Sequence, residues 1–219
     1  MLLGIHRNTA FRWRHRILDE APHHEPVPLL GMVEVADTRF PFSEKGRRRT
    51  VDGKFAGDAY SSSSRLDRRR VSVSIALDRS GRFAGAITGM RRPVVVGLRA
   101  CFEARIARGA TVLTSDGRFS AHATCARGLG LDVWSGVAGT PPVRELVHTA
   151  TARRFITEFR GWLKRFRGVS TYYLENYVWW FAILRRVERS HGCAELLHWS
   201  LAPPEPTIPD DTARAVADT

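Results

Sequence analysis

A carboxylate follows an alternating run of residues in the stretch GMVEVADTRFPF, residues 31–42. Val33 and Val35 recur with the two-residue period that predicts a buried β-strand. Asp37 comes at the end of this alternation, where a rigid strand could hold a metal ion at fixed geometry. Its neighbour Ala36 has no ligand atom, and adjacent strand residues face opposite sides. The chemistry of this segment therefore depends on which of the two positions points into a site.

A second group of chemically distinctive residues is basic and lies in the first 20 positions. The pattern predicts a helix from about Asn8 to Leu18, with Asn8 or Thr9 as its cap. Apolar residues form one stripe of this helix and arginines crowd the other sides, as in the recognition half of a helix-turn-helix. A basic helix that docks on its own domain would look the same. The residues expected to contact DNA here are Arg7, Asn8, Thr9, Arg12, Arg14 and Arg16.

The whole chain is basic, with a formal net charge of +12 over 219 residues. Arginine dominates, and guanidinium groups stay charged and bind phosphate through two parallel hydrogen bonds. The charge favours a nucleic-acid partner. A solvated basic surface or a ribosome-adjacent protein would have the same charge.

Cysteine usage and hydropathy indicate the compartment. Cys101, Cys125 and Cys193 show no CxxC spacing, which argues against a disulfide scaffold or a zinc site and favours buried thiols in a reducing cytoplasm. The apolar runs are too short to span a bilayer. We therefore expect a cytoplasmic protein without a membrane partner.

The middle of the chain supplies the elements that must position these residues. Its order of strands and helices predicts an α/β fold, a mixed sheet with crossover helices. The predicted elements after the first strand are a hairpin of 71–78 and 83–88, a helix over 93–108, a strand over 110–117, a helix over 119–127 and a strand over 131–134.

The C-terminal third is predicted to be helical, because aromatic residues recur at helical spacing on two stripes, one near Phe159 and one near Tyr177. Such stripes are more often core than base-stacking surfaces. The polar segment over 44–70 is predicted to be a mobile basic loop, which fits a DNA-backbone contact or plain disorder equally well. The expected organisation is a partial helix-turn-helix over 1–20, a linker over 21–28, an α/β domain over 29–190 and a disordered acidic tail over 202–219.

Four of these segments, in this order, carry a resemblance to a known family. They are GIHRNTAFRWRHRIL, VEVADTRF followed by EKGRR, LTSDG, and HTATARRFITEFRGWLKRFRGVSTYYLENYVWW. The chain resembles bacterial insertion-sequence transposases that join a zinc ribbon and a helix-turn-helix to an RNase H-like DDE domain. The zinc ribbon has no counterpart here, so we expect the chain to be truncated at its N-terminus relative to that family.

The resemblance implies an RNase H-like sheet, a DNA substrate and a metal cofactor. Three acidic or amide side chains would hold two Mg²⁺ or Mn²⁺ ions for in-line attack on a DNA phosphodiester. Asp116, between Ser115 and Gly117, suits one ligand position; an ordinary turn or helix cap is the alternative for this Ser-Asp-Gly. The implied partners are the terminal inverted repeats of the element, target DNA and further copies of the chain.

Two ligand positions depart from the family pattern. The family's catalytic Asp falls on Ala36, and its third ligand, five residues after His148, falls on Arg153. Alanine cannot coordinate a metal and arginine repels it. Asp37 would substitute if its strand were bulged. Glu158, a possible third ligand, lies five residues beyond Arg153, about 140° around a helix.

The resemblance also places DNA contacts on this helix, at Arg160 and Lys164. Two hypotheses follow. In the first, the protein is an active transposase that uses Asp116 with Asp37 and Glu158. In the second, it is a non-catalytic DNA-binding remnant of a transposase. An α/β domain that binds RNA is a third possibility.

Overall fold

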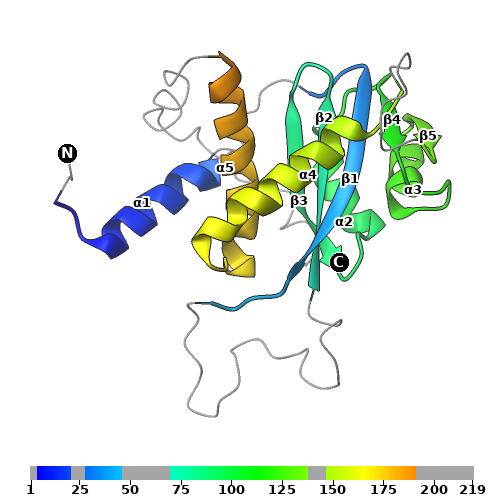
Figure 1. Cartoon of the computed structure of the whole chain (residues 1–219). Helices are drawn as coiled ribbons and strands as arrows, with labels where there is room; N and C mark the ends of the chain where they lie inside the picture. Colours follow the sequence, from blue (N-terminus) through cyan, green and yellow to red (C-terminus); the bar gives the residue numbers. More distant parts are fainter. Residues whose placement is uncertain (1–3, 21–27, 46–69, 138–146, 191–219) are drawn as a thin grey trace, which may run out of the picture.

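The computed structural model describes residues 4–20, 28–45, 70–137 and 147–190 (Figure 1). The acidic tail, the basic loop beyond residue 45 and the linker up to residue 27 lie outside this part of the chain. The described elements are α1 (Arg7–Glu20), β1 (Met32–Pro41), β2 (Arg70–Asp78), β3 (Phe83–Met90), α2 (Val95–Phe102), β4 (Thr111–Thr114), α3 (Ala121–Gly128), β5 (Asp132–Ser135), α4 (Ala150–Leu163), the 3₁₀ helix η2 (Lys164–Phe166) and α5 (Thr171–Ser190).

The strands form one five-stranded mixed sheet in the order β3-β2-β1-β4-β5. The β1–β2 and β2–β3 pairs are antiparallel, whereas β4 pairs in parallel with both β1 and β5. Helices flank this sheet, with α4 crossing one face of it (Figure 1). The predicted α/β fold with a mixed sheet and flanking helices is confirmed.

Alternating side chains of β1 build a separate core on each face of the sheet. Ala36 and Phe40 belong to the core beneath α4 and α5, where Phe155 and Phe159 pack against the strands. Val33 and Val35 belong to the core on the other face, with residues of α2 and α3. A buried strand with both faces covered has few polar positions, so each polar residue on β1 requires a partner.

Two helices differ from the sequence-based expectation in length. The helix expected over 93–108 ends at Phe102. The residues after it turn, and Ile106 then forms a parallel bridge with Leu29. The helix expected from 119 begins at Ala121, since the Ser120 hydroxyl caps it by accepting the Ala123 N–H at 3.2 Å.

Helix α1 lies against α5, away from the sheet (Figure 1). The His15 ring contacts the Tyr173 ring at 4.0 Å between centroids, and Leu18 is buried. The structure shows α1 as a single helix, and residues 1–3 lie outside the described part, so the helix-turn-helix stays a prediction. Helices occupy 150–163 and 171–190 as the aromatic spacing indicated, while residues 191–219 lie outside the described part.

No helix in the described ranges is long and apolar enough to cross a membrane.

Candidate functional site

The candidate site lies where β4 ends beside the longer strand β1. The two strands pair in parallel up to Val35 and Thr114, and β1 then continues to Pro41. Ala36 and Asp37 therefore lie beyond the last residue of β4. Asp37 pairs with β2 in an unbroken antiparallel register, so the strand reaches the site without the bulge that the sequence comparison required.

A pocket of about 330 Å³ occupies this place. It brings together both strand positions, the residues after β4 and one side of α4. Because Ala36 faces the α4 side and Asp37 the opposite side, each approaches the pocket from its own face of the sheet. Its lining residues are Ala36, Asp37, Ser115, Asp116, Arg153, Ile156 and Thr157.

Asp37, Asp116 and His122 form a group whose ligand atoms all lie within 4.8 Å of one another. His122 Nδ1 is 3.0 Å from Asp116 Oδ2. Two carboxylates and one imidazole are donors that a divalent cation accepts. Within the described residues, this group is where a metal ion is best accommodated.

Sequence reasoning missed His122, which lies in the first turn of α3 and is almost fully buried. The sequence feature that could have indicated it is its spacing of six residues from Asp116, with the helix cap Ser120 between them. The cap starts α3 so that the histidine lies near the strand end. A single histidine on an otherwise small-residue helix gave no reason to choose it.

A short chain of hydroxyl groups continues from the other nitrogen of this imidazole. His122 Nε2 is 3.2 Å from Ser74 Oγ, which is 2.7 Å from Thr88 Oγ1. All three side chains are buried. The ring is thus fixed at both nitrogens, and its Nδ1 is directed to Asp116.

The pKa of the Asp116 carboxyl group is lowered by its surroundings. The hydrogen bond with His122 lowers its pKa, burial opposes that shift, and the charges of His122 and Arg153 lower it further. Asp116 is therefore ionised at neutral pH, as a metal ligand must be.

The structure does not bring Glu158 into this group. Its two carboxylate oxygens accept Arg154 Nε at 2.7 Å and Arg185 NH1 at 2.6 Å. Glu158 is not among the described residues that line the pocket. Its place on α4 is that of an ion-paired surface residue.

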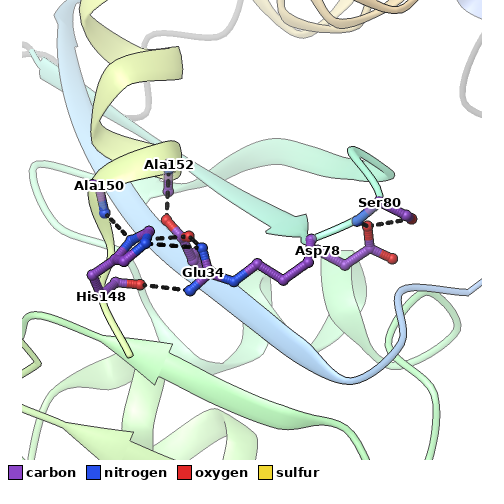
Figure 2. A network of polar contacts seen from close by, with 7 residues as sticks. Glu34, Asp78, Ser80, His148, Ala150 and Ala152 are labelled. Carbon is purple, nitrogen blue, oxygen red and sulfur yellow. Dashed lines mark hydrogen bonds and ion pairs between the residues drawn. The ribbon is translucent and has the colours of Figure 1, made fainter. Parts of the chain in front are cut away.

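Helix α4 is fixed to the sheet by a buried carboxylate (Figure 2). Glu34 is 1% exposed, and its Oε2 accepts the backbone N–H of Ala152 at 2.9 Å. The Glu34 Oε1 atom accepts Arg79 NH1, and His148 Nδ1 lies 3.5 Å from the same oxygen. A carboxylate at a helix N-terminus is favoured by the exposed N–H groups and the helix dipole. Because Arg153 follows Ala152 directly, this anchor also sets its position over the pocket.

The arginine in this network is held by the turn between β2 and β3. Asp78 Oδ1 accepts Ser80 N at 2.9 Å and Ser80 Oγ at 2.6 Å (Figure 2). Gly81 completes the turn with a φ of 88°, in the left-handed region that glycine adopts without strain. Arg79 therefore projects toward Glu34 from a short, hydrogen-bonded turn.

The residues expected to contact DNA divide into two groups. On α1, Arg7, Asn8, Arg12 and Arg16 are exposed and Thr9 is half-buried. Arg14 instead donates to Tyr177 Oη at 3.1 Å and lies over the Trp180 ring.

On α4, Arg160 donates to Thr38 Oγ1 at 3.0 Å and lies over the Phe40 ring. Lys164, at the start of η2, is exposed. Arg14 and Arg160 thus both have partners within the chain, whereas the other basic positions face solvent.

No protein-family model and no curated protein matches this sequence.

Proposed function

We propose that this protein is an insertion-sequence transposase by descent that binds double-stranded DNA at element ends and no longer cleaves it. The observation that supports this most is the shared pocket of Ala36, Asp116 and Arg153. These are the three positions at which the transposase resemblance puts the metal ligands. Their convergence supports the alignment, while the residues at two of them argue against the reaction.

The fold is compatible with this proposal. A sheet of order 3-2-1-4-5, with antiparallel strands on one side of β1 and parallel strands on the other, suits an RNase H-like domain. Glu34 and His148, both part of the resemblance, contact each other at the start of α4. Residues 114 apart in the sequence thus meet, which supports the alignment of both segments.

The side chains of the pocket do not fit two Mg²⁺ ions. Such a pair is held by several carboxylate oxygens around hard, mainly oxygen-liganded cations. Ala36 provides no oxygen, and the guanidinium of Arg153 adds a positive charge to the same pocket. The two-ion cleavage reaction therefore lacks both ligands and charge balance in this chain.

DNA binding is supported by charge and by exposed arginines. The chain carries a formal net charge of +12, and Arg7, Arg12 and Arg16 project from α1 into solvent. Clustered arginines bind phosphates and provide the sequence-independent part of DNA affinity.

Restoring the family's ligands tests the proposal. Wild-type protein should bind terminal-repeat DNA but leave it uncut in Mg²⁺ or Mn²⁺. The double variant Ala36→Asp/Arg153→Glu should nick it in a metal-dependent way, and adding Asp116→Ala should abolish that gain. Failure of the wild type to bind DNA would refute the proposal, as would tighter retention on structured RNA.

A second candidate function is an active metal-dependent DNA strand-transfer enzyme. The proximity of Asp37 and Asp116 favours it, because their ligand atoms lie within 4.8 Å. The same assay decides between the two. Cleavage by the wild type that is lost in Asp116→Ala and in Asp37→Asn would establish this second function.

A further inference from the structure

We infer that Asp37, Asp116 and His122 bind a single transition-metal ion of the Zn²⁺ type, at a site distinct in composition from the Mg²⁺ site of the transposase resemblance. His122 has no place in that resemblance, and the inference does not depend on DNA binding. It is carried by the three ligands, by the hydroxyl chain behind the imidazole and by the pocket that opens onto Asp37 and Asp116.

The distances suit one ion. Bonds from Zn²⁺ to imidazole nitrogen and carboxylate oxygen are about 2.0–2.2 Å, so two ligand atoms of one ion lie at most about 4.4 Å apart. His122 Nδ1 and Asp116 Oδ2, 3.0 Å apart, already satisfy this limit. The whole group is within 4.8 Å, so binding requires the half-buried Asp37 carboxylate to move slightly closer to the ion.

The hydroxyl chain prepares the imidazole for this role. A metal-bound histidine donates the N–H of its other nitrogen to an acceptor that fixes the ring. Ser74 Oγ occupies that position at 3.2 Å from Nε2, and it can donate in turn to Thr88 Oγ1 at 2.7 Å. Metal binding then takes place at Nδ1 of the tautomer that carries its proton on Nε2, so a neutral imidazole binds the ion and keeps its one proton.

The charges and the chemistry of the ligands limit the site to one ion of this type. Two carboxylates against the guanidinium of Arg153 leave one net negative charge in the pocket, enough for one cation. Imidazole nitrogen suits Zn²⁺, whereas Mg²⁺ prefers six oxygens and releases its waters reluctantly. The site should therefore select Zn²⁺ over Mg²⁺.

The test measures Zn²⁺ binding to the full chain without DNA, by calorimetry and by equilibrium dialysis. Asp37→Asn, Asp116→Asn and His122→Ala should each bind one Zn²⁺ fewer than the wild type. His6→Ala, which removes an exposed histidine beside α1, should leave the stoichiometry unchanged. Excess Mg²⁺ should not displace the ion.

Ser74→Ala tests the positioning role of the hydroxyl chain. It should keep the stoichiometry and weaken Zn²⁺ affinity by about 10–100-fold, the usual effect of removing such a partner. Co²⁺ loaded in place of Zn²⁺ should show visible absorption bands that shift in this variant and disappear in His122→Ala.

Circular dichroism checks that each variant is folded. If His122→Ala does not fold, the inference is tested with Asp37→Asn, which is an isosteric change at a half-buried position. An unchanged Zn²⁺ stoichiometry in folded Asp37→Asn and Asp116→Asn would overturn the inference, as would displacement of Zn²⁺ by the same excess of Mg²⁺. DNA binding in a chelator is measured separately, so failure of either proposal is recognised independently.

Discussion

The backbone N–H of Ala152 donates a 2.9 Å hydrogen bond to the buried carboxylate of Glu34. This bond joins the first turn of α4 to the central strand of the sheet. The same carboxylate accepts Arg79 from the β2–β3 turn. The strand β1, the helix α4 and the β2–β3 turn are therefore linked through one side chain.

Removing this carboxylate should destabilise the fold. Glu34→Ala leaves the Ala152 N–H without its acceptor and removes the ion pair of Arg79, which keeps its contact with the His148 carbonyl. We expect the free energy of unfolding to fall by about 2–3 kcal/mol, since Arg79 is partly solvated. Glu34→Gln keeps an acceptor for Ala152 and should lose less. Urea unfolding measures both. Glu103→Gln, which breaks the exposed Arg99–Glu103 pair, is the matched control and should change little. Equal effects of Glu34→Ala and this control would contradict the prediction.

Two glycines in helices should respond oppositely to alanine. A Cβ at Gly97 would lie 2.4 Å from the Thr88 carbonyl oxygen, because α2 packs closely on the backbone of β3. Gly97→Ala should cost about 1–3 kcal/mol through overpacking. At Gly161 in α4 nothing lies within 4 Å, and Gly161→Ala should stabilise by about 0.5–1 kcal/mol. Thermal unfolding of the two variants checks the opposite signs.

The buried His15 should make stability sensitive to acid. Burial is the main cause of its lowered pKa, and Arg14 lowers it further against a smaller opposing effect of Asp19. In the unfolded chain the imidazole gains its proton near its ordinary pKa of 6.5. Stability from its neutral form is thus complete above that pH and is lost as pH falls through 6.5 toward the lower folded value.

His15→Phe isolates this effect, because the phenyl ring keeps the packing on Tyr173 and removes the titration. Urea unfolding at pH 7.5 and 5.5 should show a larger loss in the wild type than in the variant. Parallel losses would mean that the protonation of His15 does not differ between the folded and unfolded states. Asn176, whose Nδ2 is 3.5 Å from His15 Nδ1, stays unchanged in both proteins.

The exposed and docked arginines of α1 should separate in a DNA-binding experiment. Arg12→Ala and Arg16→Ala should each weaken binding and make the log–log salt dependence shallower by about one unit per lost phosphate contact. Arg14→Ala should mainly lower thermal stability, because its guanidinium bonds to Tyr177. Fluorescence anisotropy across a salt series measures the slopes. A slope that is unchanged in the double variant would mean that Arg12 and Arg16 do not contact DNA.

The sequence predicted those elements whose periodicity is local. The hairpin of β2 and β3 follows from strict alternation around Gly81, and the structure has strands at Arg70–Asp78 and Phe83–Met90. The expected end of α2 was wrong because a tertiary pairing of Leu29 with Ile106 terminates the helix. Such a pairing between distant residues has no local pattern.

The candidate site was only partly predictable for the same reason. The transposase resemblance implied that Asp37 and Asp116 would lie together, and both line the pocket. Arg14 and Arg160 looked like free DNA contacts, but they bond to residues 163 and 122 positions away. His122 was missed because its relation to Asp37 arises only when α3 packs on the sheet.

Within one turn of α4, different residues attach the helix to the sheet and line the pocket. The side chains of Ala152 and Phe155 are buried, and the backbone N–H of Ala152 donates the hydrogen bond to Glu34. The side chain of Arg153 is exposed. The architecture thus places no demand on residue type at this position. A protein built this way can exchange one reaction for another, or give one up, by a substitution that its thermal stability does not register.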